Sequence, residues 1–159
     1  AKARFDADTF YYRGNGALDV LSDTKFNAET SRDRNVILYG NADTNSAWTA
    51  LLERSPVRVR RDGVRVGERP VSGDDLAAFC VRPSPLPGSS ALVGAVGFTG
   101  PTGARLAQRL PIFVSGVHYP DFFIAGLRLL ELGLPGVRAA GFFGVDWSLR
   151  ADECTVDER

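Results

Sequence analysis

The sequence predicts an α/β domain built on a mostly parallel, Rossmann-like sheet with flanking helices and two β-hairpins. Short apolar runs bounded by glycine or proline recur along the chain, which is typical of strands buried on both faces. Segments with helical spacing follow several of these runs, and this alternation favours parallel pairing. Asn-Gly and Asp-Gly pairs also lie between apolar runs, where they favour tight turns.

Length and composition indicate one globular domain over residues 1–159, of which 44% are hydrophobic and 24% charged. The net charge is zero, so no overall field attracts nucleic acid or an anionic membrane. No apolar run approaches the roughly 18 residues that a membrane helix needs. We therefore expect neither nucleic acid nor a membrane as partner. Because the chain contains no methionine and starts at Ala1, we expect a fragment of a larger protein.

The first third of the chain is predicted to hold a hairpin, a strand and a helix. Residues 1–34 are expected to form the hairpin, turning at Asn15-Gly16, and a polar lead-in. The apolar run 35–40 is predicted as a buried strand. Polar residues after it cap a helix that continues to about Arg54, before Pro56.

The middle of the chain is predicted to form a second hairpin and a further strand. Over residues 56–71, apolar and basic residues alternate on both sides of Asp62-Gly63. This alternation predicts valines facing inward and arginines facing outward. Residues 73–83 are expected to form a strand, and a loop rich in proline, serine and glycine follows it.

The last third supplies the remaining strands of the predicted parallel sheet, at 91–96, 111–117 and 137–144. A helix is expected over 102–110, and a shorter one is expected to end at Gly133. The polar tail, 150–159, is expected to fray.

The stretch GFTGPTGARL, from Gly97 to Leu106, is a candidate anion site at the start of a predicted helix. Its candidate ligand-binding residues are Gly97, Thr99, Gly100, Thr102 and Gly103. The glycine spacing is similar to a variant of the dinucleotide fingerprint, but no acidic residue ends the next predicted strand. No lysine lies nearby, which excludes a Walker-type loop. We favour a structural turn and keep anion binding as the alternative.

Asn41 and Asp43 join this candidate site because they follow a predicted strand and precede a helix. In open α/β sheets, ligands gather beyond the carboxyl ends of strands. The same residue types also cap helices and form turns, and we favour that role.

Ser115, His118 and Asp121 form a second polar candidate, because a triad requires these residue types. Their spacing within one extended segment and the missing G-x-S-x-G elbow argue against a catalytic triad. With one histidine and the two cysteines Cys80 and Cys154, the chain lacks the ligands of a standard structural zinc site. We expect no metal and no cofactor, and leave a disulfide between the cysteines open.

Five segments in this order resemble the C-terminal region of large secreted bacterial α/β-hydrolases of the prolyl-oligopeptidase-like or esterase-like type: ILYGNADTNSAW, SGDDLAAFCVRP, VGAVGFTGPTGARL, YPDFFIAGL and GVRAAGFFGVDWS. The resemblance runs from about Phe10 to Leu149. It implies a non-catalytic region beside a hydrolase domain that carries the nucleophilic serine elsewhere. It also implies a periplasmic or extracellular location.

The sequence therefore predicts an accessory domain that packs against the hydrolase domain of the same parent protein or shapes access to its substrate. Self-association through an apolar patch stays open. The alternative is a domain that binds a small molecule, phosphate or nucleotide through the Gly97–Gly103 loop. A stand-alone hydrolase using Ser115 and His118 ranks last.

Overall fold

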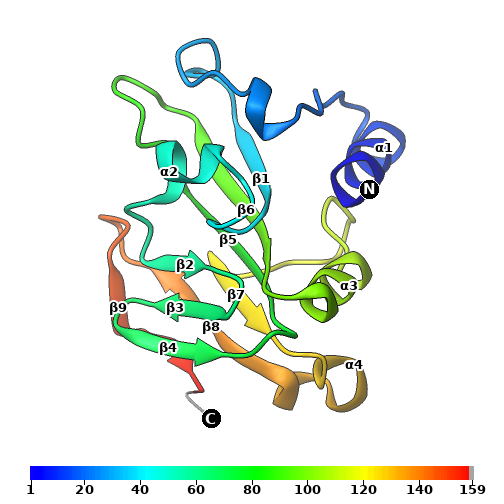
Figure 1. The fold of residues 1–159 in the computed structure, drawn as a ribbon, viewed down its shortest axis with the longest axis vertical. Coiled ribbons are helices and arrows are strands. Elements are labelled where there is room, and N and C mark those ends of the chain that lie inside the picture. The colour runs from blue at the N-terminus through cyan, green and yellow to red at the C-terminus, as the bar shows by residue number, and fades with distance from the viewer. Residues whose placement is uncertain (158–159) are drawn as a thin grey trace.

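A computed structural model describes residues 1–157 as two β-sheets with a few short helices (Figure 1). The larger sheet has six strands in the order β1-β6-β5-β7-β8-β9, and the smaller has three in the order β2-β3-β4. The strands are β1 Val36–Gly40, β2 Val57–Val59, β3 Gly63–Val66, β4 Arg69–Ser72, β5 Ala77–Pro83, β6 Leu92–Phe98, β7 Phe122–Ala125, β8 Val137–Phe143 and β9 Leu149–Val156. The helices are α1 Lys2–Gly14, α2 Ala47–Leu52, α3 Pro101–Arg109 and α4 Leu129–Leu132, with 3-10 turns η1 Asp23–Lys25 and η2 Leu134–Gly136.

The prediction of a mostly parallel, Rossmann-like sheet is wrong. Only β1 and β6 pair in parallel, and every other neighbouring pair in the described sheets is antiparallel. The apolar runs misled because β5 and β6 are buried on both faces, as strands of a parallel sheet are. Here the smaller sheet covers one face and α3 covers the other, so two-sided burial arises without parallel pairing.

Two predicted segments of the C-terminal half also differ. Residues 111–117, expected to be a strand, belong to the connection from α3 to β7, and the strand itself is Phe122–Ala125. The tail expected to fray from residue 150 instead lies largely in β9, at the edge of the larger sheet. An edge strand exposes much of its surface, so its polar composition does not distinguish it from a loop. Residues 158–159 of that tail lie outside the described part.

The N-terminal hairpin is also absent, because residues 2–14 form α1. Asn15 is the C-cap of this helix, in the left-handed conformation with φ 50° and ψ 41°. The Asn-Gly pair thus uses its tolerance of positive φ to end a helix rather than to turn a hairpin. The second predicted hairpin is confirmed as β2 and β3, with their valines buried and Arg58 and Arg65 exposed.

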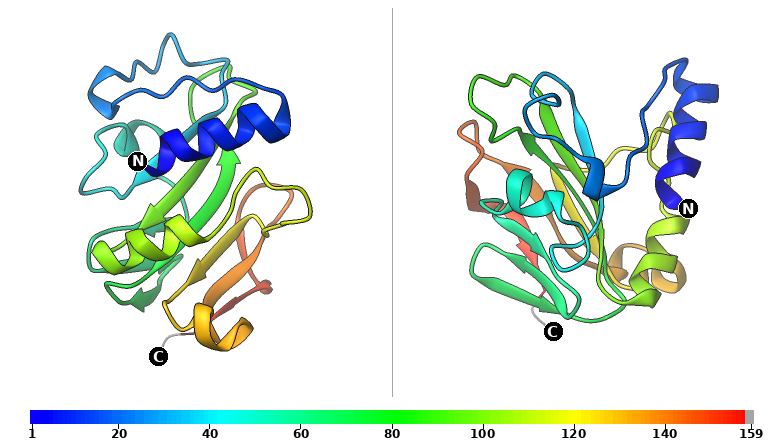
Figure 2. Two further views of the ribbon diagram at one scale, coloured as in Figure 1. Left: turned by 90° about the vertical axis from the view of Figure 1, so that its right-hand side faces the viewer. Right: turned by 45° about the horizontal axis from the view of Figure 1, so that its top comes forward.

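The core lies on the two faces of the larger sheet, one of which is flanked by the smaller sheet and the other by α3 (Figure 2). On one face, the valines of the smaller sheet and the apolar side of α2 pack against β5, β6, β7 and β8. On the other, Leu106, Ala107 and Leu110 from α3 and its C-cap pack against Phe79 and Val96. Among residues 1–157, no helix combines the length and apolar character that a membrane span requires.

Candidate functional site

The parallel pairing of β1 with β6 brings the two main candidate segments to one edge of the larger sheet. Gly40 ends β1 in register with Gly97 on β6. The turn that carries Asn41 and Asp43 therefore lies beside Thr99 and the start of α3. The sequence analysis predicted that these residues lie beyond the carboxyl ends of neighbouring parallel strands. The parallel pair of β1 and β6 has this arrangement.

Asn41 is buried and organises the turn after β1. Its side-chain amide donates to the carbonyl of Phe98 at 2.9 Å, which ties the end of β1 to the end of β6. Its side-chain oxygen accepts from the amide of Asp43 at 3.1 Å and from the hydroxyl of Thr44 at 3.0 Å. Donor and acceptor of the side chain are therefore both engaged within the protein.

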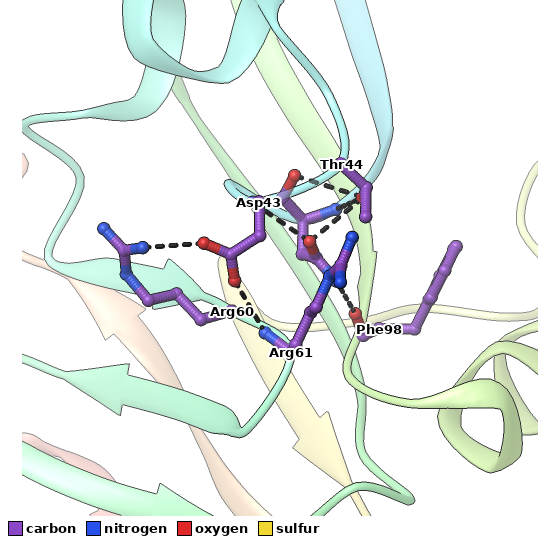
Figure 3. Close-up of polar contacts among 6 residues, drawn as sticks. Asp43, Thr44, Arg60, Arg61 and Phe98 are labelled. Carbon is purple, nitrogen blue, oxygen red and sulfur yellow. Dashed lines mark hydrogen bonds and ion pairs between the residues drawn. The ribbon is translucent and has the colours of Figure 1, made fainter.

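Asp43 holds the turn of the β2–β3 hairpin against the same edge (Figure 3). One carboxylate oxygen lies 2.7 Å from the Arg60 guanidinium, and the other accepts from the backbone amide of Arg61 at 2.9 Å. This arrangement makes Asp43 a structural anchor between the two sheets. Its carboxylate already has a cationic partner, which lowers its capacity to bind a cation.

The glycine-rich segment packs closely against the chain that joins β4 to β5. A Cβ on Gly103 would lie 2.2 Å from the carbonyl oxygen of Leu76, and one on Gly100 would lie 2.8 Å from that of Asp74. A Cβ on Gly97 would lie 2.9 Å from the side chain of Val59. The glycines therefore permit the close approach of backbone to its neighbours.

The donors of this segment are also largely engaged. The amide of Gly103 donates to the carbonyl of Asp74 at 3.4 Å. Thr99 is buried, and its hydroxyl accepts from the amide of Leu76 at 3.0 Å. Pro101 has no N–H to offer, so in the described chain the amides of Gly100 and Thr102 are the N-terminal donors of α3 for which no protein acceptor is found. Two separate amides make a poorer anion site than the several converging amides that phosphate loops present.

Ser115, His118 and Asp121 do not form a catalytic arrangement. Asp121 accepts from the backbone amide of Phe143 at 2.9 Å, so its carboxylate secures β8. Ser115 and His118 are exposed in the connection before β7. Within residues 1–157, no hydrogen bond joins any two of the three side chains.

The structure adds a buried polar cluster that the sequence reasoning missed. Asp6 of α1 lies 2.7 Å from the ammonium of Lys2 and accepts a 2.9 Å hydrogen bond from the Tyr39 hydroxyl on β1. Burial and the neighbouring Asp6 carboxylate raise the pKa of Tyr39. The i,i+4 spacing of Lys2 and Asp6 is a helix signal, but a hairpin was expected there.

The two cysteines are both free, and the disulfide left open by the sequence does not form. Cys80 is buried on β5, and burial raises the pKa of its thiol to about 12. Cys154 on β9 accepts a hydrogen bond from Arg69 at 3.1 Å.

Four leucines within eight residues around α4 expose much of their side chains, and we call them the leucine patch. They are Leu127, Leu130, Leu132 and Leu134, with exposed fractions of 40%, 48%, 46% and 83%. The helix α4 joins β7 to β8 at the end of the larger sheet remote from the N-terminal segment (Figure 2).

No group of three or more histidine, cysteine or acidic side chains in residues 1–157 is arranged to hold a metal ion. Comparisons of the chain with protein-family models, with curated proteins and with solved structures return no match.

Proposed function

We propose that this chain is a non-catalytic accessory domain of a larger bacterial hydrolase of the peptidase or esterase class. In this proposal it packs on the catalytic domain, or shapes access to it, in a secreted parent protein. The observation that carries the proposal is the leucine patch. The resemblance of five sequence segments to hydrolase C-terminal regions supplies the identity of the partner.

The leucine patch supports a docking role because four large apolar side chains fall within eight residues of a surface connection. Single exposed leucines are normal, whereas a cluster marks contact with another protein surface. The two charged residues between them, Arg128 and Glu131, carry opposite signs. An apolar partner surface with a polar rim fits such a patch.

The state of the polar candidates is consistent with a domain that carries out no chemistry of its own. Asn41, Asp43 and Thr99 use their side chains to join strands and turns. The phosphate or nucleotide alternative gains no support from the Gly97–Gly103 loop, because the Gly103 amide already has an acceptor.

The proposal is tested first on the gene, whose reading frame should encode a hydrolase domain with a G-x-S-x-G elbow. That domain, produced separately, should bind this chain in isothermal titration calorimetry. The double variant Leu130→Asp, Leu134→Asp should weaken binding at least about tenfold, since it places charges in an apolar interface.

The matched control is Val145→Asp, which adds a charge at an apolar residue that is 98% exposed. It lies beyond the far end of β8, a strand on the order of 20 Å long, and should leave binding unchanged. Equal weakening by both variants contradicts docking through the leucine patch. A dimer of this chain that the double variant dissociates would assign the patch to self-association instead.

A further inference from the structure

A hollow of about 840 Å³ lies around the edge strand β1, on the opposite part of the molecule from the leucine patch, and its lining includes residues from both faces of the larger sheet. In the part beneath α1, that helix is the roof, β1, β6 and β5 form the floor, and residues 18–23 and 112–121 close the sides. Figure 2 shows α1 on the same side of the larger sheet as α3. The volume falls in the range of small-molecule sites, about 300–1,000 Å³.

Over its first two turns, α1 presents the small side chains of Ala3 and Ala7 to the hollow. The helix contributes Ala3, Ala7 and Phe10 to the lining, at the i, i+4 and i+7 positions of one face. A helix that packs on a sheet normally carries large apolar residues at such positions. Asp6 is the one buried residue of α1, so apolar packing does not hold this helix to the body.

Polar and aromatic contacts hold α1 above the hollow instead. Asp6 joins it to Tyr39 on the floor, and Lys2 also donates to the carbonyl of Leu110 at 3.3 Å. Towards the other end of α1, the ring of Phe10 lies 5.0 Å from that of Phe113. The roof is therefore fixed near both of its ends while the space beneath it stays open. Because the hollow is open on one side, a small molecule can enter it without displacing any packed side chain.

The lining selects the chemistry of that occupant. Ile37, Phe79, Val96 and Tyr119 add aliphatic and aromatic surface to the floor and side. The lining also contains four charged side chains, each with a partner in the chain. Asp19 pairs with Arg34 at 2.6 Å, Asp23 accepts two bonds from Ser46, and Asp121 accepts from Phe143. Only Asp19 has a cationic partner. Asp23 and Asp121 accept from neutral donors, so the lining keeps a net negative charge that disfavours an anionic ligand.

We propose that the hollow beneath α1 is a binding site for an uncharged, largely apolar small molecule. The ligand lies between Phe10 and Phe79, and any polar end faces the open side. This site shares no residue with the leucine patch, so the inference stands apart from the accessory role.

The test uses the neutral fluorescent probe N-phenyl-1-naphthylamine and two competitors of equal chain length. We expect one probe molecule per chain with micromolar affinity, and displacement by 1-decanol at least about tenfold better than by decanoate. Equal displacement by alcohol and carboxylate would overturn the neutral selectivity. Binding without saturation would overturn the site.

Variants that add side-chain volume inside the hollow test whether the probe binds there. Ala3→Leu with Ala7→Leu adds side-chain volume to the roof and should weaken binding at least about tenfold. Arg4→Leu adds a leucine on the exposed side of the same helix and should bind normally. Gly94→Leu fills the floor from β6 and serves as a second variant if the roof variant does not fold, as checked by circular dichroism. Unchanged binding in a folded filling variant would overturn the proposal.

Discussion

The hydroxyl of Tyr39 on β1 donates a 2.9 Å hydrogen bond to the carboxylate of Asp6 on α1, and Asp6 is 1% exposed. This bond joins the N-terminal helix to the edge strand of the larger sheet. Few apolar contacts duplicate it, since Asp6 is the buried residue of that helix. The position of α1 therefore depends on a polar link, with Lys2 balancing the charge of Asp6.

Replacing Tyr39 with phenylalanine should release α1 locally. Hydrogen bonds to charged groups contribute about 1.5–3 kcal/mol, so the amides of α1 should exchange with solvent at least about tenfold faster. Hydrogen–deuterium exchange measures this directly. Tyr119→Phe is the control, because its exposed hydroxyl donates only to the Pro111 carbonyl, at 3.1 Å. Unchanged α1 exchange in Tyr39→Phe would show that other contacts hold the helix.

Stability should fall at alkaline pH because two neutral groups, the buried thiol of Cys80 and the partly buried hydroxyl of Tyr39, resist ionisation. The pKa of Cys80 is raised to about 12 from 9.0, and burial also raises the pKa of Tyr39 from 10.0. The unfolded chain therefore loses these protons at lower pH than the folded chain. Their stabilisation is complete below pH 9 and declines above it, by about 1.4 kcal/mol per pH unit for each titrating group.

Urea unfolding at a series of pH values separates this effect from ordinary packing loss. Cys80→Ala should lower the unfolding free energy at neutral pH and flatten its decline above pH 9. Val93→Ala, in the same core cluster, should lower the unfolding free energy by the same amount at every pH and leave its decline above pH 9 unchanged. Parallel curves for the two variants would contradict the titration of Cys80 as the cause.

Gly103→Ala tests whether the glycine is needed because the neighbouring backbone leaves no room for a side chain. If this helical glycine had free space, alanine would stabilise α3 by about 1 kcal/mol. Its Cβ would instead lie 2.2 Å from the backbone oxygen of Leu76, so we expect a loss of more than about 3 kcal/mol. Gly94→Ala is the control, since its nearest neighbour would be an ordinary contact at 3.6 Å from Ile37. Stabilisation by Gly103→Ala would contradict the close approach.

Local signals in the sequence identified much of the secondary structure but not its pairing. The hairpin about Asp62-Gly63 and the α3 helix were correct, because turn chemistry and spacing specify them locally. Strand direction depends on what covers each face of the sheet. The apolar run of β5 could not reveal that another sheet, rather than a second layer of helices, covers one side.

The sequence allowed us to predict where the candidate residues of the β1 and β6 ends lie, but not which of their polar atoms are free to bind a ligand. Residues after β1 and β6 meet because those strands are parallel, as the sequence argument assumed. Which polar atoms remain free depends on contacts with distant segments, such as Asp43 with Arg60 and Gly103 with Asp74. The hollow beneath α1 was invisible because its roof was expected to be a hairpin.

Asn41 and Asp43 stand two residues apart in one turn, yet their replacement by alanine should have unequal effects. Asn41→Ala removes the 2.9 Å bond to the Phe98 carbonyl and the acceptor for Asp43 and Thr44 in a buried position. Leaving buried polar groups unpaired costs about 1–3 kcal/mol each, so we expect a loss of about 2–4 kcal/mol.

Asp43→Ala should cost under about 1 kcal/mol, because both partners of its carboxylate, the guanidinium of Arg60 and the backbone amide of Arg61, lie at exposed residues and can bind water instead. Thermal and urea unfolding of both variants give the comparison. Asn41→Asp adds a sharper measure, since a carboxylate cannot donate to the Phe98 carbonyl and would be repelled by it. It should therefore be at least as destabilising as Asn41→Ala, whereas a stable Asn41→Asp protein would show that the bond across β1 and β6 is dispensable.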